Sequence, residues 1–391
     1  MRISRQIIDR YPAKMVGRLA NRLAVKYLID CDSLFDPFCG SGAVLAAAAQ
    51  RGIPVAGVDV NPYAILLTKV KLEGFDVLEA AELCDQLLEG AEAGKRRLPV
   101  EWPAKCYWFT DRTLEKYERI RYVGRRMELE DTPQGRAVLL AYSLSVRRCS
   151  RADQRSPKPF ISRRARELRQ GRHFDPFEEI RRQLHGLSRW WGGRRITVRD
   201  VVCADLRTWN GGRGDVKRYS HIVTSPPYIN AQDYFRNFKL ELYLLAGLVD
   251  FNADELKVRF VGRERGTLLS GIGKMELRWH RQILPNLVSM ELSHPHHAAV
   301  VHRYLTDMMK CFERMAQVLD GNGLLVLVCG DNLVGGHRIL TWRVLSRMLL
   351  NGGFALLDRF GDRIVSRSIP PARQGHKGLI KQEVVSAFRR Q

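Results

Sequence analysis

Residues 33–73 read SLFDPFCGSGAVLAAAAQRGIPVAGVDVNPYAILLTKVKLE. Two short apolar segments in this stretch, Ser33–Phe38 and Val55–Val60, have the length and composition of buried strands. A helical segment follows each of them, at Ala43–Arg51 and Tyr63–Glu73. This strand-helix-strand-helix order predicts a parallel sheet with helices packed on it, and therefore an α/β fold.

The same alternation returns in the second half of the chain. We expect an amphipathic helix at 14–29 and further helices at 298–319 and 339–350. Strands are expected at 196–203, 221–224, 324–329, 354–360 and 383–388. Gly321-Asn322-Gly323 is expected to end the long helix. Two stretches do not follow the alternation. The predicted organisation is an N-terminal part at 1–94, a mostly helical insertion at 95–195, and a C-terminal part at 196–391 that carries a second insertion at about 230–297.

The charge of the chain is strongly positive, with 64 Lys and Arg against 42 Asp and Glu and a net charge of +22. Residues 147–195 alone hold 15 basic side chains against five acids, interleaved with aromatic residues. Such a surface favours nucleic acid as the partner. An anionic membrane surface, or a helical insert that is merely solvated, is the alternative.

Other partners and cofactors find less support in the composition. No apolar run reaches the roughly 18–20 residues that span a bilayer, and no signal peptide is recognisable, so we expect a cytoplasmic protein without a membrane partner. The eight cysteines form no CxxC pair. Four histidines between His294 and His302 have no acidic or thiol ligand at helical spacing, so no metal site is expected.

The turn Asp36-Pro37-Phe38-Cys39-Gly40-Ser41-Gly42 is suited to a cofactor. Its two glycines can take a positive φ and let backbone N–H groups approach a ligand, at the start of a helix that favours an anion. Asp36 could bind an ammonium group. Because nucleotide enzymes share this architecture, the turn alone is weak evidence.

Two further carboxylates follow later strands. Asp59 lies 17 residues after Gly42, where it can accept both hydroxyls of a ribose, or else cap the helix that begins near Pro62. Asp205 can accept from an adenine amino group, or else form a local turn.

The loop Ser225-Pro226-Pro227-Tyr228 follows another strand at the carboxyl edge of the sheet, where ligands bind. Its prolines fix φ twice and remove two N–H donors, which leaves the Ser225 hydroxyl and the Pro226 carbonyl as acceptors for a base amine. Tyr228 offers a ring for stacking. A turn that binds a methyl donor and a loop that holds a base amine together favour methyl transfer to that amine. Such a transfer needs alignment rather than a general base, so no catalytic triad is expected. Cys39 lies at the cofactor turn rather than at the position of a nucleophile.

Together these motifs resemble the S-adenosylmethionine-dependent DNA amino-methyltransferases. Similar segments are Tyr11–Lys14, Asp36–Gly42, Asp59–Pro62 and the catalytic loop Thr224–Tyr228. The resemblance implies a Rossmann-like class I methyltransferase fold with a mainly parallel seven-stranded sheet and helices on both faces. The implied catalytic residues are Ser225, Pro226, Pro227 and Tyr228. The implied cofactor contacts are Tyr11, Lys14, Asp36, Pro37, Phe38, Cys39, Gly40, Ser41, Gly42, Asp59, Val60, Asn61, Asp205 and Leu206.

The resemblance also implies the target and the partners. A serine at the head of the catalytic loop is similar to the cytosine-N4 branch, so cytosine N4 is preferred over adenine N6. The order of the motifs differs from many cytosine-N4 enzymes. Double-stranded DNA with a flipped-out base is the expected substrate, and a cognate restriction endonuclease is a candidate partner. A tRNA guanine-N2 methyltransferase and an inactive DNA-binding relative are the alternatives.

Overall fold

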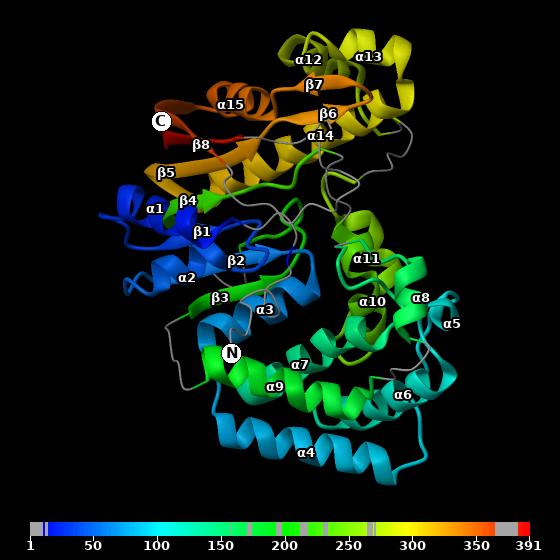
Figure 1. The fold of residues 1–391 in the computed structure, drawn as a ribbon. Helices are drawn as coiled ribbons and strands as arrows, with labels where there is room; N and C mark the ends of the chain where they lie inside the picture. Colours follow the sequence, from blue (N-terminus) through cyan, green and yellow to red (C-terminus); the bar gives the residue numbers. More distant parts are fainter. Residues whose placement is uncertain are drawn as a thin grey trace.

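The computed structural model describes residues 11, 15–156, 158–169, 174–192, 198–211, 218–229, 234–263, 269, 271–363 and 382–391. Its centre is a seven-stranded sheet in the order β3-β2-β1-β4-β5-β9-β8 (Figure 1). The strands are β1 Leu34–Asp36, β2 Val55–Asp59, β3 Val198–Cys203, β4 Tyr219–Thr224, β5 Leu319–Gly330, β8 Phe354–Arg363 and β9 Gln382–Arg390.

The strand directions match the expected fold class. β3, β2, β1, β4 and β5 are parallel, whereas β9 is antiparallel to both β5 and β8. β1 lies between β2 and β4, so the connections leave it in opposite directions. That position opens a crevice at the carboxyl ends of the strands, where α/β folds bind ligands. The prediction of a mainly parallel Rossmann-like sheet is confirmed.

Helices cover both faces of the sheet because neighbouring strand residues point to opposite faces. Leu34 packs in one core cluster with α1 Gly17–Tyr27 and α2 Ala43–Ala49. Phe35 belongs to the other cluster, together with residues of α14 Pro295–Val318 and α15 Thr341–Asn351. The remaining helices on the chain around the sheet are α3 Pro62–Glu73, α12 Lys274–Ile283 and α13 Leu287–Ser293.

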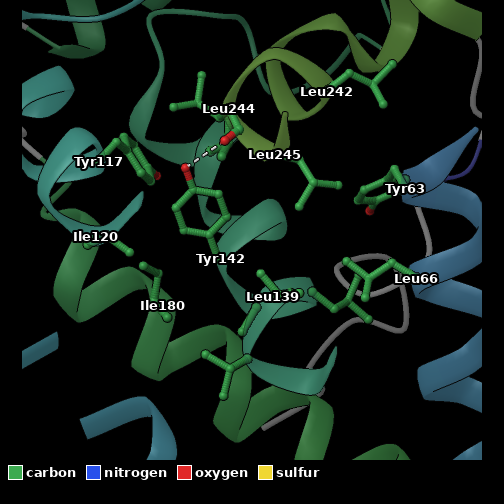
Figure 2. Packing of buried hydrophobic residues seen from close by; sticks show 14 of the residues in the cluster. Tyr63, Leu66, Tyr117, Ile120, Leu139, Tyr142, Ile180, Leu242, Leu244 and Leu245 are labelled. Atoms are coloured by element: carbon green, nitrogen blue, oxygen red, sulfur yellow. Dashed lines mark hydrogen bonds between the residues drawn. The ribbon is translucent and has the colours of Figure 1, made fainter. Parts of the chain in front are cut away.

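A helical body lies beyond the β3 edge of the sheet (Figure 1). It is built from α4 Val77–Ala93, α5 Lys105–Trp108, α6 Asp111–Arg126, α7 Pro133–Cys149, α8 Arg163–Arg169, α9 Pro176–Trp191, α10 Tyr234–Leu245 and α11 Ala253–Arg259. One hydrophobic cluster joins all of these helices except α8 to α3. Figure 2 shows its middle, where the Tyr142 hydroxyl donates to the Leu244 carbonyl across 3.1 Å.

This body differs from the predicted insertion in its limits. The helical segment begins with α4 at Val77, which packs on α6, α7 and α9, rather than at residue 95. The second insertion supplies α10 and α11 to the same core. Residues 193–197, at the predicted end of the first insertion, lie outside the described residues.

Two further details differ from the sequence predictions. The long helix ends at Val318, because Leu319 already pairs with Tyr219, and the segment Gly321–Gly323 lies within β5 instead of ending the helix. A two-stranded hairpin, β6 Asn332–Val334 and β7 His337–Ile339, was not predicted, since three-residue strands give too short a pattern. No helix in the described part of the chain is long and apolar enough to cross a bilayer.

Candidate active site

A pocket opens at the carboxyl ends of β1, β2 and β4. Thirteen residues predicted from the sequence line it: Tyr11, Asp36, Pro37, Phe38, Cys39, Gly40, Ser41, Asp59, Val60, Asp205, Leu206, Ser225 and Pro227. Gly42, Asn61, Pro226 and Tyr228 lie next to these residues but not on the pocket wall. Lys14 lies outside the described residues. The structure thus brings the glycine turn and the catalytic loop to one cavity.

The glycine turn needs both of its glycines. Gly40 and Gly42 have φ values of +50° and +67°, a region that side chains other than glycine rarely adopt. A Cβ on Gly42 would lie 2.7 Å from Cγ2 of Thr68 on α3. The Thr68 hydroxyl donates to the Gly40 carbonyl across 2.9 Å. Thr68 of α3 therefore supports the turn by this hydrogen bond, and Gly40 still lines the pocket.

Asp59 fixes the same turn from the end of β2. Its Oδ2 accepts from the Gly40 N–H and its Oδ1 from the Asn61 N–H, both across 2.9 Å. The cap of α3 is Asn61, whose side chain accepts from the Tyr63 N–H, so Asp59 does not fill the capping role. Burial raises the pKa of Asp59 to about 6. The carboxylate lines the pocket and retains lone pairs for further donors.

Asp36 links the cofactor turn to the catalytic strand. Its Oδ1 accepts from the Thr224 hydroxyl across 2.7 Å and from the Phe38 N–H across 3.1 Å. Thr224 ends β4 and directly precedes Ser225. Burial raises the pKa of Asp36 to about 7. A buried carboxylate of this kind fits a ligand ammonium group, which would stabilise its ionised form.

Asp205 has a different set of partners from the one expected. Arg207 binds it through two guanidinium nitrogens, at 2.9 and 2.6 Å, and through its own N–H at 3.1 Å. This is the local-turn alternative, because the carboxylate closes a turn onto the residue two positions later. Asp205 and Leu206 still line the pocket, so the contact with an adenine amino group stays a prediction.

The catalytic loop is divided between the pocket and the core. Ser225 and Pro227 face the pocket, whereas the Tyr228 ring is only 6% exposed and packs in the hydrophobic core. The Tyr228 hydroxyl donates to Oε1 of Glu383 on β9 across 2.7 Å. Burial raises the pKa of Glu383. The ring that was expected to stack on a base is therefore held behind the pocket wall in this structure.

Nine pocket residues were not assigned to the site from the sequence, and four of them come from one part of the chain: Tyr234, Arg259, Phe260 and Val261. Tyr234 begins α10, and the other three form the end of α11 and the loop after it. All four belong to the second insertion, which carries no local motif for a ligand. The sequence signal that remains is an arginine followed by two apolar residues and Gly262, which is common in many loops.

No group of three or more His, Cys, Asp or Glu side chains in the described residues could hold a metal ion. The histidine-rich segment instead contributes to a buried pair. Nδ1 of His302 lies 3.0 Å from Nδ1 of His280, and Nε2 of His302 lies 2.7 Å from Glu291. These contacts place His302 in packing between α12, α13 and α14 rather than at the pocket.

Comparison with known proteins gives matches on the cofactor side of the chain. Residues 14–139 match the family of D12 class N6 adenine-specific DNA methyltransferases. A Type II methyltransferase of Methanocaldococcus jannaschii, M.MjaII, is 28% identical over 113 residues, and M.MvaI of Kocuria varians, also a Type II methyltransferase, is 36% identical over 64 residues. The resemblance to DNA amino-methyltransferases is confirmed.

These matches are partial in length. They cover 29% and 16% of this chain, and the chain spans only 21% and 14% of the two relatives. Among solved structures, the match to TrmN from Thermus thermophilus covers 99% of this chain and 53% of the TrmN chain. The two are 11% identical, with a TM-score of 0.32. A likeness that distant adds nothing to the fold, which is established by the strand order itself.

The comparisons also bear on the target base that the sequence predicts. The matched family is described as adenine-specific at N6. The preference for cytosine N4, drawn from the serine at the head of the catalytic loop, is not supported by these comparisons. The alternative drawn from the sequence, adenine N6, is better supported.

The raised pKa values of Asp36 and Asp59 predict how the affinity of the pocket for a cationic ligand, such as the expected S-adenosylmethionine, depends on pH. Both carboxylates have pKa values in the folded protein above 3.8, near 7 and 6. Without a ligand, the folded protein therefore loses stability relative to the unfolded chain as pH rises from 3.8 to these folded pKa values. A cationic ligand favours the ionised form, so its affinity should rise from pH 5 to pH 8, by up to about tenfold per pH unit. Calorimetric titration across this range measures it, and a flat or falling affinity contradicts it.

Gly262 predicts a second measurable effect. Its φ is +76°, and an added Cβ would lie 2.5 Å from the Tyr228 carbonyl oxygen. Gly262→Ala should therefore displace the catalytic loop and lower kcat/KM by about 10- to 100-fold, as small misplacements of a reacting group do. Gly353→Ala is the matched control, since its φ of +83° carries the same strain but its Cβ meets nothing within 4 Å. Equal activity of the two variants, at equal folded fraction, contradicts the prediction.

Proposed function

We propose that this chain transfers a methyl group from S-adenosylmethionine to the exocyclic amine of a base in DNA, with adenine N6 as the target atom. The observation that carries the proposal is the shared pocket. Ser225 and Pro227 line the same cavity as Asp36, Asp59 and Gly40. The hydrogen bond from Thr224 to Asp36 fixes the catalytic loop against the cofactor turn.

The residues of the glycine turn and β2 fit the cofactor. Gly40 and Ser41 line the pocket, and a Cβ on Gly40 would lie 3.1 Å from the ring of Tyr11, another residue of the pocket lining. Asp36 would hold the ammonium of the methionine part, and Asp59 the ribose hydroxyls. When bound, S-adenosylmethionine supplies a methyl group on a positively charged sulfur, which makes that methyl electrophilic.

The catalytic loop contributes alignment. Pro226 and Pro227 have no N–H groups, so the loop offers acceptors to an amine and no competing backbone donors at these positions. Both N–H groups of the amine can donate to the Ser225 hydroxyl and the Pro226 carbonyl, which turns the nitrogen lone pair toward the methyl carbon. In this arrangement the C–N bond would form as the C–S bond breaks, and the surplus proton on nitrogen would leave to solvent.

DNA as the substrate is supported by the charge of the chain, +22. A base inside a duplex has to leave the stack to reach this pocket, at a cost of a few kcal/mol. Residues 147–195 were the first candidate for the DNA surface. Five arginines of this segment already form ion pairs with carboxylates of the protein: Arg148, Arg155, Arg163, Arg181 and Arg182. This lowers the charge that the segment can offer to phosphates.

The test is methylation of unmethylated genomic DNA by the purified protein with isotope-labelled S-adenosylmethionine, followed by digestion to nucleosides and mass analysis. We expect labelled N6-methyladenine. Labelled N4-methylcytosine would keep the reaction and change the base, in line with the serine at position 225. Tandem incubations with tRNA and with the Ser225→Ala variant are the controls. Label in tRNA alone, or no label in any nucleic acid, overturns the proposal.

A further inference from the structure

The loop after α11 joins three parts of the site. Arg259, Phe260 and Val261 line the pocket, and Gly262 lies against the Tyr228 carbonyl. The loop therefore forms the wall between the cofactor pocket and the catalytic loop. Its charged members, Arg259 and Arg263, stand at either end of the apolar pair.

Arg207 holds this wall in place. Its guanidinium donates to the Arg259 carbonyl across 2.8 Å and binds Asp205 at 2.6 Å and Asp307 of α14 at 2.7 Å. The side chain of Arg207 is only 15% exposed, and those of Asp205 and Asp307 are 11% and 6% exposed. Bidentate and buried ion pairs of this kind fix geometry. Both aspartates are thus already bound by Arg207.

The remaining arginines leave the region positive. Arg263 is half-buried, and burial, together with the nearby charges of Arg207 and Arg303, lowers its pKa against the opposing charge of Asp307, which Arg207 already binds. Arg259 is exposed. Among the described residues, neither Arg259 nor Arg263 has a carboxylate within 4.0 Å. Arginines gathered around a partly buried site without their own acids favour an anionic ligand.

The position of these arginines indicates which anion. A base that enters the pocket leaves its sugar and phosphates outside it, and Arg259 is an exposed arginine of the pocket lining, with Arg263 four residues further along the chain. Guanidinium groups bind phosphate oxygens through two parallel N–H donors. We propose that Arg259 and Arg263 bind a backbone phosphodiester next to the base that enters the pocket. This rests on the proposed function, because it takes DNA as the substrate of this pocket.

The test compares Arg259→Gln and Arg263→Gln with Arg278→Gln. Arg278 is an exposed arginine on α12 of the same insertion, so its removal changes the net charge equally. For each protein, DNA affinity is measured over a salt series, and KM for DNA and Kd for S-adenosylmethionine are measured separately. Each pocket-wall variant should lower the slope of log affinity against log salt by about one and raise KM for DNA about tenfold. Cofactor affinity should stay within about twofold.

A neutral linkage in the DNA locates the contact. On a duplex with a mapped target, one methylphosphonate replaces each phosphate flanking the target nucleotide in turn. One of these positions should weaken transfer by the wild-type protein about as much as Arg263→Gln does, and the two changes together should add nothing further. Equal effects at every linkage, or additive effects of variant and linkage, overturn the inference.

The outcomes separate the inference from the proposed function. If the wild-type protein methylates DNA and both pocket-wall variants behave like Arg278→Gln, only the phosphate site is wrong. If the variants instead raise Kd for S-adenosylmethionine, the arginines belong to the cofactor and the inference is overturned. If the wild-type protein methylates no DNA, the proposed function fails. An unchanged salt slope in the variants would then overturn the phosphate site as well.

Discussion

Asp59→Ala should weaken S-adenosylmethionine binding about 100-fold, or about 2.7 kcal/mol. Two causes act together. The change removes the carboxylate that would accept the ribose hydroxyls, and it removes the acceptor that holds the Gly40 N–H at 2.9 Å. Calorimetric titration gives the affinity. At saturating cofactor, kcat should stay within a few-fold of the wild-type value, because Ser225 and Pro227 keep their places.

Asp76→Ala is the matched control for this variant. Asp76 also accepts from two backbone N–H groups, those of Leu78 and Glu79, but at the start of α4 and away from the pocket residues. Its loss should cost about 1 kcal/mol of folding stability as a lost helix cap and leave cofactor affinity unchanged. Equal cofactor affinities for the two variants would remove Asp59 from the site.

Tyr228→Ala should have the opposite profile: transfer falls by about 100-fold, because the ring supports the loop that carries Ser225 and Pro227, while cofactor affinity changes little. The ring is buried and its hydroxyl binds Glu383, so truncation leaves a cavity in the core and a carboxyl without its donor. Removing a buried aromatic ring costs about 3–5 kcal/mol of stability. Activity therefore has to be measured by single turnover at a temperature where an unfolding curve shows the variant folded.

Tyr228→Phe separates the ring from the hydroxyl. It keeps the packing and removes only the bond to Glu383. Tyr142→Phe is its control, since Tyr142 is also a buried tyrosine that loses one hydroxyl bond, to the Leu244 carbonyl, in the helical body. Loss of transfer in Tyr228→Phe but not in Tyr142→Phe would show that the hydroxyl positions the loop. Wild-type transfer by folded Tyr228→Ala would contradict a catalytic role for the ring altogether.

The first half of the site was predictable because its signals are local. Each signal lies within a few residues of sequence: glycines that require positive φ, a carboxylate at a strand end, and two adjacent prolines. Strand order then places them, since β1, β2 and β4 are neighbours and their carboxyl ends meet. For this reason the fold class and the meeting of Gly40, Asp59 and Ser225 at one pocket followed from the motifs.

The remainder depends on contacts between residues far apart in the chain. Glu383 meets Tyr228 only because β9 inserts next to β5, and no pattern around position 383 indicates a buried acid. Asp205 was expected to accept from an adenine amino group or to form a local turn, and Arg207, two residues later in the sequence, binds its carboxylate in this structure. Arg207 holds the end of α11 at the pocket, because it donates to the Arg259 carbonyl and pairs with Asp307 of α14. Sequence spacing cannot show these contacts.

The shared core of the helical body has a practical consequence for engineering. Tyr63 and Leu66 of α3 pack in the same cluster as Tyr142 of α7 and Leu244 of α10 (Figure 2). α3 also carries Thr68, which supports the glycine turn. Grafting this helical module from a relative, as a way to redirect specificity, would expose half of an interior unless α3 and α10 were exchanged with it. Chimeras cut at Glu73 should therefore be poorly soluble, whereas those that exchange α3 to α9 together with α10 and α11, and keep β3 and β4, should retain an intact helical core.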